Sequence, residues 1–425
     1  MPIMSSSIAD RAGDSNRDFL RSHPWLAFAL DLRAADRRSW QMIGEARSKC
    51  RHLMFTPLKP LVSRDLEMLY LAKGMQATTA IEGNTLTIEQ VQGAIEGTLQ
   101  VPPSQRYLKQ EVDNVLDACR EVEETVDAED GFKVTPAVLK DLNARVLRDL
   151  RHEDHVEPGA YRTVSVVVGS YRAAPPGDVE FLTELLCEWL NDGFETSDHS
   201  DAFPMAFAKA VAAHVYIAWI HPFGDGNGRT ARLVELGILT AAGIPRVAAH
   251  LLSNHYNLTR TVYYRQLEHA SRSGGDLCPF LAYAAEGFVD LLQEELNRVH
   301  EEVLQIAWEN YVHEVFRDRP GNAAKRQRDL VIALGRHGRP VARDQIPTLT
   351  PALALAYASK QAKTVTRDVN AIVQTGLVVR TPHGLRARQD IMLGFMPRVG
   401  GETRKNVLAD FSTPEARLAT LYEVP

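Results

Sequence analysis

The stretch from His221 to Arg232 gathers most of the groups in this chain that could do chemistry together. It reads His-Pro-Phe-Gly-Asp-Gly-Asn-Gly-Arg-Thr-Ala-Arg and so combines an imidazole, a carboxylate, a carboxamide, three glycines and two guanidiniums. Apolar, helix-forming sequences flank it: 203–220 has no glycine, and 233–242 is followed by Gly243, a good helix stop. The pattern predicts a helix, a tight loop and a second helix.

That geometry favours an anion in the loop. Gly226 and Gly228 let the backbone approach a ligand closely. The second helix is expected to begin at about Gly228, so its free N–H groups and its dipole point into the loop. Arg229 and Arg232 are three residues apart and therefore share a helix face beside the anion.

The residue types indicate a polyphosphate. Two guanidiniums and helix amides suit several phosphate oxygens better than one carboxylate. Asp225 offers a hard oxygen ligand for Mg²⁺. His221 titrates near neutral pH at the entrance of the loop, where a general base belongs.

Alone, a His-Pro pair marks a helix end and a Gly-Asn-Gly marks a turn, but together these elements resemble the Fic family signature, His-x-Phe-x-Asp/Glu-Gly-Asn-Gly-Arg-x-x-Arg. The resemblance implies transfer of AMP from ATP to a Ser, Thr or Tyr hydroxyl of a target protein. It implies that Gly226, Asn227 and Gly228 cradle phosphate oxygens, Asn227 helping on the α-phosphate. Arg229 and Arg232 would bind the β- and γ-phosphates, Asp225 would hold magnesium, and His221 would take the hydroxyl proton.

Bulk composition limits the remaining choices. The chain has 425 residues and a formal net charge of −6, which suits two or three domains and gives no global nucleic-acid signal. Cys50, Cys119, Cys187 and Cys278 lie far apart, which argues against a zinc site or disulfide framework and favours a reducing cytoplasm. No signal peptide is recognisable, no run approaches a membrane helix, and we expect no membrane partner.

Residues 1–105 form a predicted N-terminal helical region. We expect a disordered tail over 1–17, helix within 25–53, and a helix of about 63–83 capped by Ser63. Thr87 opens a capping box for a further helix to about Gly97.

The end of the 63–83 helix carries a second motif. Glu82 alone would be an ordinary surface charge, but Thr78-x-x-x-Glu82-Gly83 resembles the inhibitory motif of the Fic family. The resemblance implies that Glu82 docks on Arg232, occupies the γ-phosphate site and misplaces the α-phosphate for attack, which can reduce the rate strongly.

Residues 106–318 form the predicted core domain, with the catalytic loop at 221–232. A β-branched run after Arg162 predicts a short hairpin. This hairpin is either structural or the Fic flap, which receives an extended target segment by strand pairing; the candidates are Val164, Ser165, Val166, Val167 and Val168. The resemblance further places Tyr263 and Tyr264 beside the adenine. Many relatives have an asparagine near the base where this chain has Ser271.

Residues 320–396 resemble a winged helix, and 397–425 is expected to be a loosely held tail. Thr364 would open a recognition helix, and Arg380, Arg386 and Arg388 lie near the wing. DNA contact and a protein-interaction or dimerisation module are equally compatible with this pattern.

The expected fold is mainly α: a Fic-type helical bundle with a β-hairpin flap and a C-terminal winged-helix domain. The expected function is protein AMPylation, including of the protein itself, with ATP as substrate, Mg²⁺ as cofactor, and autoinhibition by Glu82. The alternatives are removal of AMP, transfer of another nucleotide or phosphate group, and a DNA-binding regulator whose core senses nucleotide. Relatives often form homodimers through the core.

Overall fold

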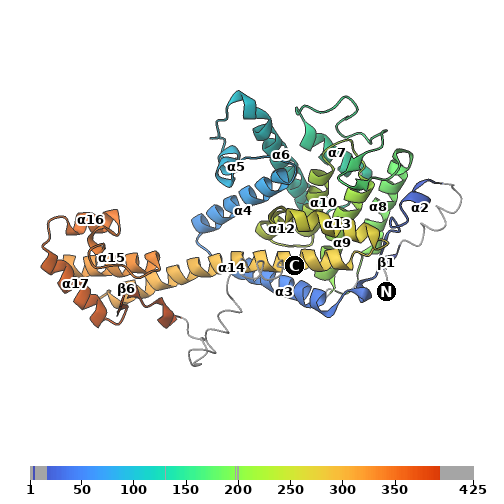
Figure 1. Ribbon diagram of the computed structural model, residues 1–425. Helices are drawn as coiled ribbons and strands as arrows, with labels where there is room; N and C mark the ends of the chain where they lie inside the picture. The colour runs from blue at the N-terminus through green and yellow to red at the C-terminus, as the bar shows by residue number, and fades with distance from the viewer. Residues whose placement is uncertain (1–2, 5–16, 130, 197, 199–200, 393–425) are drawn as a thin grey trace. The chain divides into compact units, whose positions relative to one another are not determined.

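The computed structural model describes residues 3–4, 17–129, 131–196, 198 and 201–392 (Figure 1). The chain divides into two compact units, Met1–Glu294 and Glu295–Pro425. The boundaries expected near 105 and 319 from sequence stay predictions. The expected tail at 397–425 lies outside the described residues.

The first unit is mainly helical, as predicted, with two small antiparallel strand pairs. Its elements, in chain order, are β1 (Ile3–Met4), α2 (Phe19–Ser22), β2 (Ala29–Leu30), η1 (Leu32–Ala34), α3 (Arg37–Phe55), α4 (Pro60–Ala80), α5 (Ile88–Ile95), η2 (Pro103–Gln105), α6 (Arg106–Glu129), α7 (Pro136–Leu147), β3 (Val167–Val168), β4 (Tyr171–Arg172), η3 (Pro176–Asp178), α8 (Val179–Gly193), α9 (Ala202–Ile220), α10 (Asn227–Ala241), α11 (Arg246–Ala249), α12 (Leu251–Leu258), α13 (Arg260–Arg272) and α14 (Cys278–Val315), whose later part belongs to the second unit.

Helices α9 and α10 pack along each other at the centre of this unit (Figure 1). Helix α9 is apolar on all sides and buried on almost all of them, which is the pattern of a central core helix. By length and composition it is also the one helix among the described residues that could cross a membrane, although 67% of it is buried inside the protein. The expectation that no run has such a length was therefore wrong.

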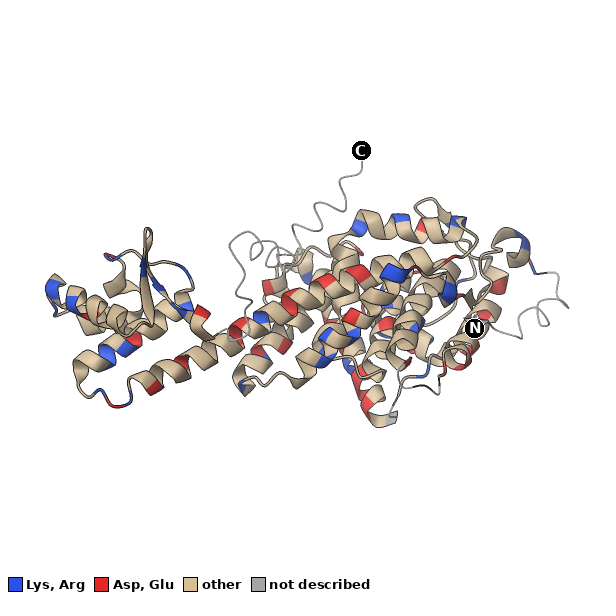
Figure 2. Cartoon of the chain, turned by 90° about the horizontal axis from the view of Figure 1, so that it is seen from below, with Lys and Arg blue, Asp and Glu red and all other residues tan. Residues whose placement is uncertain are grey.

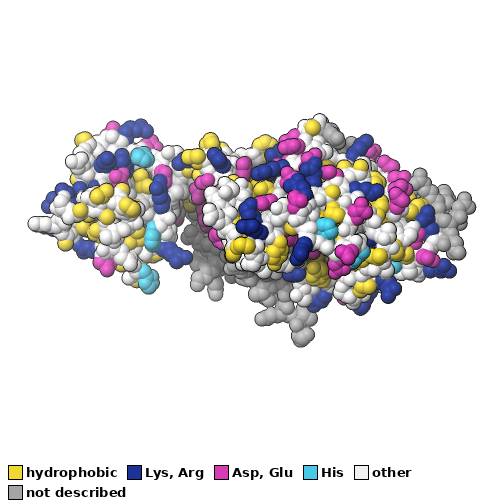
Figure 3. Space-filling model, turned by 90° about the horizontal axis from the view of Figure 1, so that it is seen from above, with side chains coloured by type: hydrophobic (Ala, Val, Ile, Leu, Met, Phe, Trp, Pro, Cys, Tyr) yellow, Lys and Arg dark blue, Asp and Glu magenta, His cyan; other side chains and the backbone are white. Residues whose placement is uncertain are grey.

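On the face seen in Figure 3, charges of both signs are interspersed.

The local signals around the helices were correct in part. The Thr87 capping box is formed in both directions, and Thr135 caps α7 with Pro136 at its first position. The expected Ser63 cap is wrong, because α4 begins one turn earlier with Pro60 in the first turn. Proline is well suited to that position, where its missing N–H costs nothing.

The N-terminal expectations also need correction. Ile3–Met4 is not a disordered tail but pairs with Ala29–Leu30, and Ile3 is buried. The rest of the expected tail up to residue 16 lies outside the described residues. Helix α3 covers only the second half of the expected 25–53 helix.

The predicted hairpin is present but short. Val167 pairs with Arg172 and Val168 with Tyr171, around Gly169, whose φ is +60°. Val167 and Val168 are 59% and 44% exposed, so this strand offers an apolar, accessible edge.

The second unit has its own apolar core around Trp308, Leu330, Leu334, Ile346 and Ile372. After α14 it contains α15 (Asn322–His337), η4 (Ile346–Thr348), α16 (Pro351–Tyr357), α17 (Ala362–Gln374), β5 (Val378–Thr381), β6 (Gly384–Ala387) and η5 (Gln389–Met392). Strands β5 and β6 form the expected hairpin, and Val341 bridges to Leu385. That this unit is a winged helix stays a prediction.

Gly74 provides a test of the packing of α4. A Cβ at this position would lie 2.6 Å from the Cβ of the buried His250 side chain, whereas a Cβ at the exposed Gly44 of α3 would meet nothing within 4 Å. We expect Gly74→Ala to lower the free energy of unfolding by about 1–3 kcal/mol through overpacking. Gly44→Ala should raise it by roughly 0.5–1 kcal/mol. Urea denaturation of both variants measures this, and equal effects would contradict the close α4–His250 contact.

Candidate active site

A cavity of about 640 Å³ lies where α9, α10, α13, the β3–β4 hairpin and the end of α4 meet. It brings together predicted residues that lie far apart in sequence. Its lining includes Glu82, Val168, His221, Asn227, Gly228, Arg232, Tyr263 and Tyr264. Asp225, Gly226 and Arg229 belong to the same loop and helix but do not line the cavity.

The loop between α9 and α10 is held by its own side chains. His221 ends α9 in a left-handed conformation, with φ 52° and ψ 62°, and Gly226 precedes α10 with φ 77°. The Asn227 carboxamide accepts from the Phe223 N–H and donates to the Phe223 carbonyl, both at 2.9 Å. Asn143 of α7 donates to the Asp225 carbonyl at 2.8 Å. The Asn227 side chain therefore shapes the loop, and its expected contact with an α-phosphate stays a prediction.

His221 is suited to accept a proton. Burial lowers its pKa to about 4, and the Arg162 guanidinium acts in the same direction. The imidazole is therefore neutral at pH 7. Its Nδ1 lies 3.4 Å from the Ala218 carbonyl, which can only accept, so Nδ1 carries the hydrogen and Nε2 has a free lone pair.

Glu82 lies on Arg232, as the motif predicted. An Arg232 Nη2 donates to Glu82 Oε1 at 2.6 Å and to the Thr78 carbonyl at 2.9 Å. The Arg232 side chain is 1% exposed, whereas the Glu82 side chain is 31% exposed toward the cavity. Gly228 permits this approach, because a Cβ there would collide with Glu82 Oε1. The carboxylate thus stands at the N-terminus of α10, where an anion is favoured.

The Glu82–Arg232 pair sets the charge state of the carboxyl group. Burial alone would raise the pKa of Glu82, but the adjacent Arg232 guanidinium and its hydrogen bond outweigh burial, and the pKa falls below its ordinary value. Glu82 is therefore ionised at neutral pH and supplies the negative charge that the buried guanidinium needs.

Arg229 is occupied by a carboxylate that the sequence analysis missed. Glu111 of α6 accepts from Arg229 at 2.6 Å, and Asp225 lies 3.3 Å from the same guanidinium. Asn84, two residues after Glu82, donates to the other Glu111 oxygen at 2.9 Å. Burial raises the pKa of Glu111, against the opposing effect of Arg229. No local pattern distinguishes Glu111 from any other helix carboxylate, so only the long-range contact identifies it.

Asp225 is the one predicted metal ligand. Its side chain is 52% exposed, and one of its oxygens accepts from the Gly226 N–H at 2.5 Å. Within the described residues, no group of three His, Cys, Asp or Glu side chains could hold a metal ion. A metal at Asp225 would therefore need most of its ligands from water or substrate.

The two tyrosines differ in their surroundings. Tyr263 is 3% exposed, and its hydroxyl lies 2.9 Å from His214 Nε2 within the core. Behind it, Tyr256 donates to the buried Glu235 at 2.9 Å. Tyr264 is 42% exposed. Both rings line the cavity, so Tyr263 forms a fixed wall and Tyr264 an accessible one. Ser271 bonds back to the Glu268 carbonyl of its own helix.

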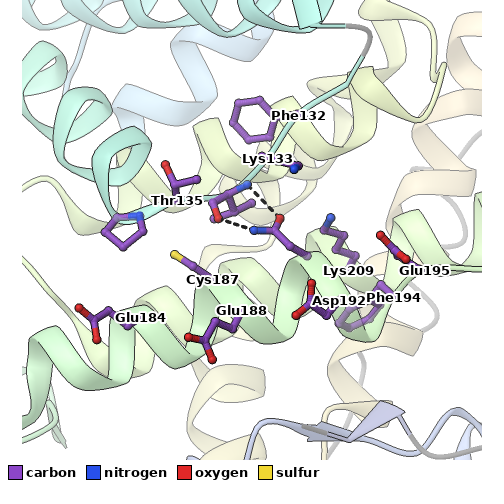
Figure 4. A pocket seen from close by; sticks show the side chains of 13 residues that line it. Phe132, Lys133, Thr135, Glu184, Cys187, Glu188, Asp192, Phe194, Glu195 and Lys209 are labelled. Atoms are coloured by element: carbon purple, nitrogen blue, oxygen red, sulfur yellow. Dashed lines mark hydrogen bonds between the residues drawn. The ribbon is translucent and has the colours of Figure 1, made fainter. Parts of the chain in front are cut away.

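A second hollow, of about 520 Å³, lies between residues 132–136 and α8 (Figure 4). Asn191 closes one side through two hydrogen bonds to the Val134 backbone. Its rim carries Glu184, Glu188, Asp192 and Glu195 against Lys133 and Lys209, a balance that disfavours a polyphosphate. The 221–232 loop makes no contribution to it.

Residues 133–239 match the Fic/DOC family model. The matched segment contains α7, the hairpin and the α9–α10 loop. The fold agrees: a Fic family protein from Desulfovibrio desulfuricans G20 aligns with a TM-score of 0.51 at 22% identity, over 86% of this chain and 98% of that one.

Curated relatives carry the name protein adenylyltransferase. Protein adenylyltransferase fic-1 of Caenorhabditis briggsae is 30% identical over 256 residues, 60% of this chain and 46% of that protein. Protein adenylyltransferase Fic of Nematostella vectensis is 31% identical over 208 residues, 49% of this chain and 44% of that protein. The chain thus spans about half the length of these curated relatives.

The Glu82–Arg232 pair predicts a pH-dependent stability. Because folding lowers the pKa of Glu82, its contribution is present above the ordinary pKa of 4.5 and is lost as the pH falls through the folded value. Wild type should therefore melt at a higher temperature than Glu82→Gln at pH 7, and the difference should shrink as the pH falls below 4.5. Melting curves from pH 3 to 8 test this, and a constant difference at all pH values would contradict it.

Proposed function

We propose that this protein transfers AMP from ATP to a Ser, Thr or Tyr hydroxyl of a target protein. One observation carries the proposal: a neutral imidazole, the N-terminus of a buried helix and a buried guanidinium line the same cavity. The names of the curated relatives support this reaction rather than another use of the same site.

The residues divide the reaction between them. The N–H groups of Asn227 and Gly228 begin α10 and, as first-turn donors, lack acceptors within the helix. They hold phosphate oxygens, and Arg232 holds the terminal phosphate. His221 Nε2 takes the proton of the target hydroxyl as its oxygen bonds to the α-phosphorus. The bond from the α-phosphorus to the bridging oxygen breaks, and pyrophosphate leaves.

Asp225 suits Mg²⁺ only together with a nucleotide. A single, half-exposed carboxylate matches the way Mg²⁺ is held by one or two protein carboxylates and substrate phosphates. The ion would neutralise phosphate charge and orient the leaving group. In such a complex Arg229, now bound to Glu111, would be the second guanidinium available to the phosphates.

In this proposal the adenine lies against the tyrosines of α13, and the target lies along the hairpin. Tyr264 presents an exposed ring for stacking, backed by Tyr263 at a centroid distance of 5.1 Å. The Val164–Val168 edge pairs with an extended target segment. The four cysteines are buried and form no disulfide with one another, which supports our assignment to the cytoplasm. The proposal includes a homodimer formed through the core.

Glu82 acts as an internal competitor of ATP. Its carboxylate occupies the guanidinium and the helix N-terminus that the terminal phosphate would use. A nucleotide that enters beside it has its α-phosphate displaced from His221, and misplacement near 1 Å can reduce a rate about 100-fold.

Two other functions have observations in their favour. Glu82 lies in the cavity with His221 and could position a water for the removal of AMP from a modified target. Separately, residues 320–392 contain twelve Lys and Arg against four Asp and Glu, although the whole chain is acidic. Figure 2 shows Lys and Arg positions on the helices and hairpin of this unit. Exposed Lys363, Arg367 and Arg386 suit DNA backbone contacts, whereas Arg326 is committed to Asp368 at 2.6 Å.

Intact-mass spectrometry after incubation with ATP and Mg²⁺ tests the proposed function. We expect Glu82→Gly to gain one or more AMP units and wild type to gain few or none, because the substitution frees Arg232. The Glu82→Gly/His221→Ala protein should lose about 10²–10⁴-fold in rate, as expected for loss of a general base.

The same samples distinguish the alternatives. Undiminished AMP transfer without His221 would refute its role as the base. No transfer by any variant that still binds ATP would refute AMP transfer. Wild type would then be tested against an AMP-modified target, and the whole chain for salt-dependent, sequence-specific DNA binding.

A further inference from the structure

Arg162 is a buried cation that the proposed chemistry does not use. It is 3% exposed and follows Gly159 and Tyr161 at the base of the hairpin. Its own N–H donates to the Pro222 carbonyl at 3.0 Å, and Tyr161 forms a bridge with Phe223. The backbone of this segment is therefore paired directly with the catalytic loop.

The Arg162 guanidinium joins two functional elements. On one side, Nε donates to the His221 carbonyl at 2.6 Å and Nη2 to the Ile220 carbonyl at 3.1 Å. On the other side, Nη1 donates to the Val164 carbonyl at 2.8 Å and Nη2 to the Ala174 carbonyl at 2.5 Å. Val164 and Ala174 are the two ends of the hairpin stem. One planar group thus ties both ends of the hairpin to the end of α9.

All these acceptors are backbone carbonyls. The ion pairs formed by the described residues include none with Arg162. Burial lowers the pKa of Arg162 to about 10, so the group still carries its charge at neutral pH. The carbonyls at the C-terminus of α9, the negative end of the helix dipole, stabilise that charge. A lysine could not reproduce this planar fork of donors.

His221 needs such support. His221 has a φ of 52°, a left-handed conformation that is strained for any residue with a Cβ. The hydrogen bond from Arg162 to the His221 carbonyl holds this conformation in place. The direction of the imidazole follows from this backbone conformation. Arg162 therefore fixes the direction in which the His221 side chain projects from the end of α9. It also fixes the position of the hairpin.

We propose that Arg162 is a positioning residue that fixes the target-binding edge of the hairpin relative to the His221 imidazole. It sets where an extended peptide paired with Val167–Val168 presents its hydroxyl. This inference rests on the proposed AMP transfer. Arg162 is not among the residues that line the cavity.

Two substitutions of Arg162 separate the effect of its hydrogen-bond geometry from the effect of its charge. The groups that act on His221 include Glu82 at the end of α4 and Asp225 in the loop, both of which raise its pKa, and Arg162, which lowers it. Arg162→Gln removes the cation and the four-way contact. Arg162→Lys keeps the cation but loses the fork. Both variants should release the hairpin, but only Arg162→Gln should raise the pKa of His221.

The test uses the full chain with Glu82→Gly, adding Arg162→Lys or Arg162→Gln, and Arg120→Gln as a control at an exposed arginine of α6. We expect kcat for AMP transfer to fall about 100-fold in both Arg162 variants, because the reacting groups are misplaced. KM for ATP should stay close to that of the Glu82→Gly parent. The acid limb of the pH–rate profile should move to higher pH in Arg162→Gln alone. The Arg120→Gln protein should match the parent.

Two measurements that need no catalytic activity, amide hydrogen exchange and NMR titration, test the role of Arg162 independently. Amide hydrogen exchange over 163–174 should be faster in both Arg162 variants, whereas exchange in α10 should not change. NMR titration of His221 should show a raised pKa in Arg162→Gln only. A raised KM for ATP with unchanged kcat would overturn the inference. Unchanged amide hydrogen exchange in the hairpin would also overturn it. If the Glu82→Gly parent transfers no AMP, the proposed function fails, while exchange and titration still decide the role of Arg162.

Discussion

The site is organised by the need of one buried guanidinium for an anion. Arg232 is 1% exposed, and removing the partner of a buried charge typically costs about 3–5 kcal/mol. The Thr78 carbonyl and the Glu82 carboxylate meet this need from the end of α4. Gly228 leaves the space in which the carboxylate can stand. Any phosphate that binds Arg232 therefore replaces an anion already present, and its net gain is the difference between two strong contacts. In the proposed function, this exchange would let the Glu82 carboxylate, in the turn after α4, control access to Arg232.

The turn after α4 contacts Arg232 directly and Arg229 through Glu111, both arginines being in α10. Glu82 binds Arg232, and Asn84 binds Glu111, which in turn holds Arg229. Two residues of this turn, Glu82 and Asn84, thus connect α4 to both guanidiniums that the proposed reaction requires. A displacement of this turn would free Arg232 directly and loosen Arg229 through Glu111. Because the pKa of Glu111 is raised by burial, that second contact is also the weaker of the two at acidic pH.

The local parts of this site could be predicted from sequence, and the long-range parts could not. The helix–loop–helix around His221, the start of α10 within one residue of Gly228 and the capping box at Thr87 follow from residue type and short spacing. The Glu82–Arg232 pair joins residues 150 positions apart and was predicted only because a family motif marks both. No such motif marks Glu111, which looks like any solvated helix carboxylate until α6 packs on α10. The early start of α4 at Pro60 shows the opposite limit: Ser63 is a good cap, but proline at the first helical turn competes with it and prevails.

The contrast between the two buried arginines explains how the site can be both rigid and responsive. Arg232 is satisfied largely by a side-chain carboxylate, which can swing away and be replaced by phosphate. Arg162 is satisfied by four backbone carbonyls, which cannot leave without opening the hairpin stem and the end of α9. A cation held by side-chain charge suits an exchangeable ligand, and a cation held by backbone dipoles suits a permanent frame. His221 lies between them, on a backbone fixed by Arg162 and facing an anion site governed by Arg232. The His221 imidazole can thus keep one orientation while the occupant of the neighbouring anion site changes.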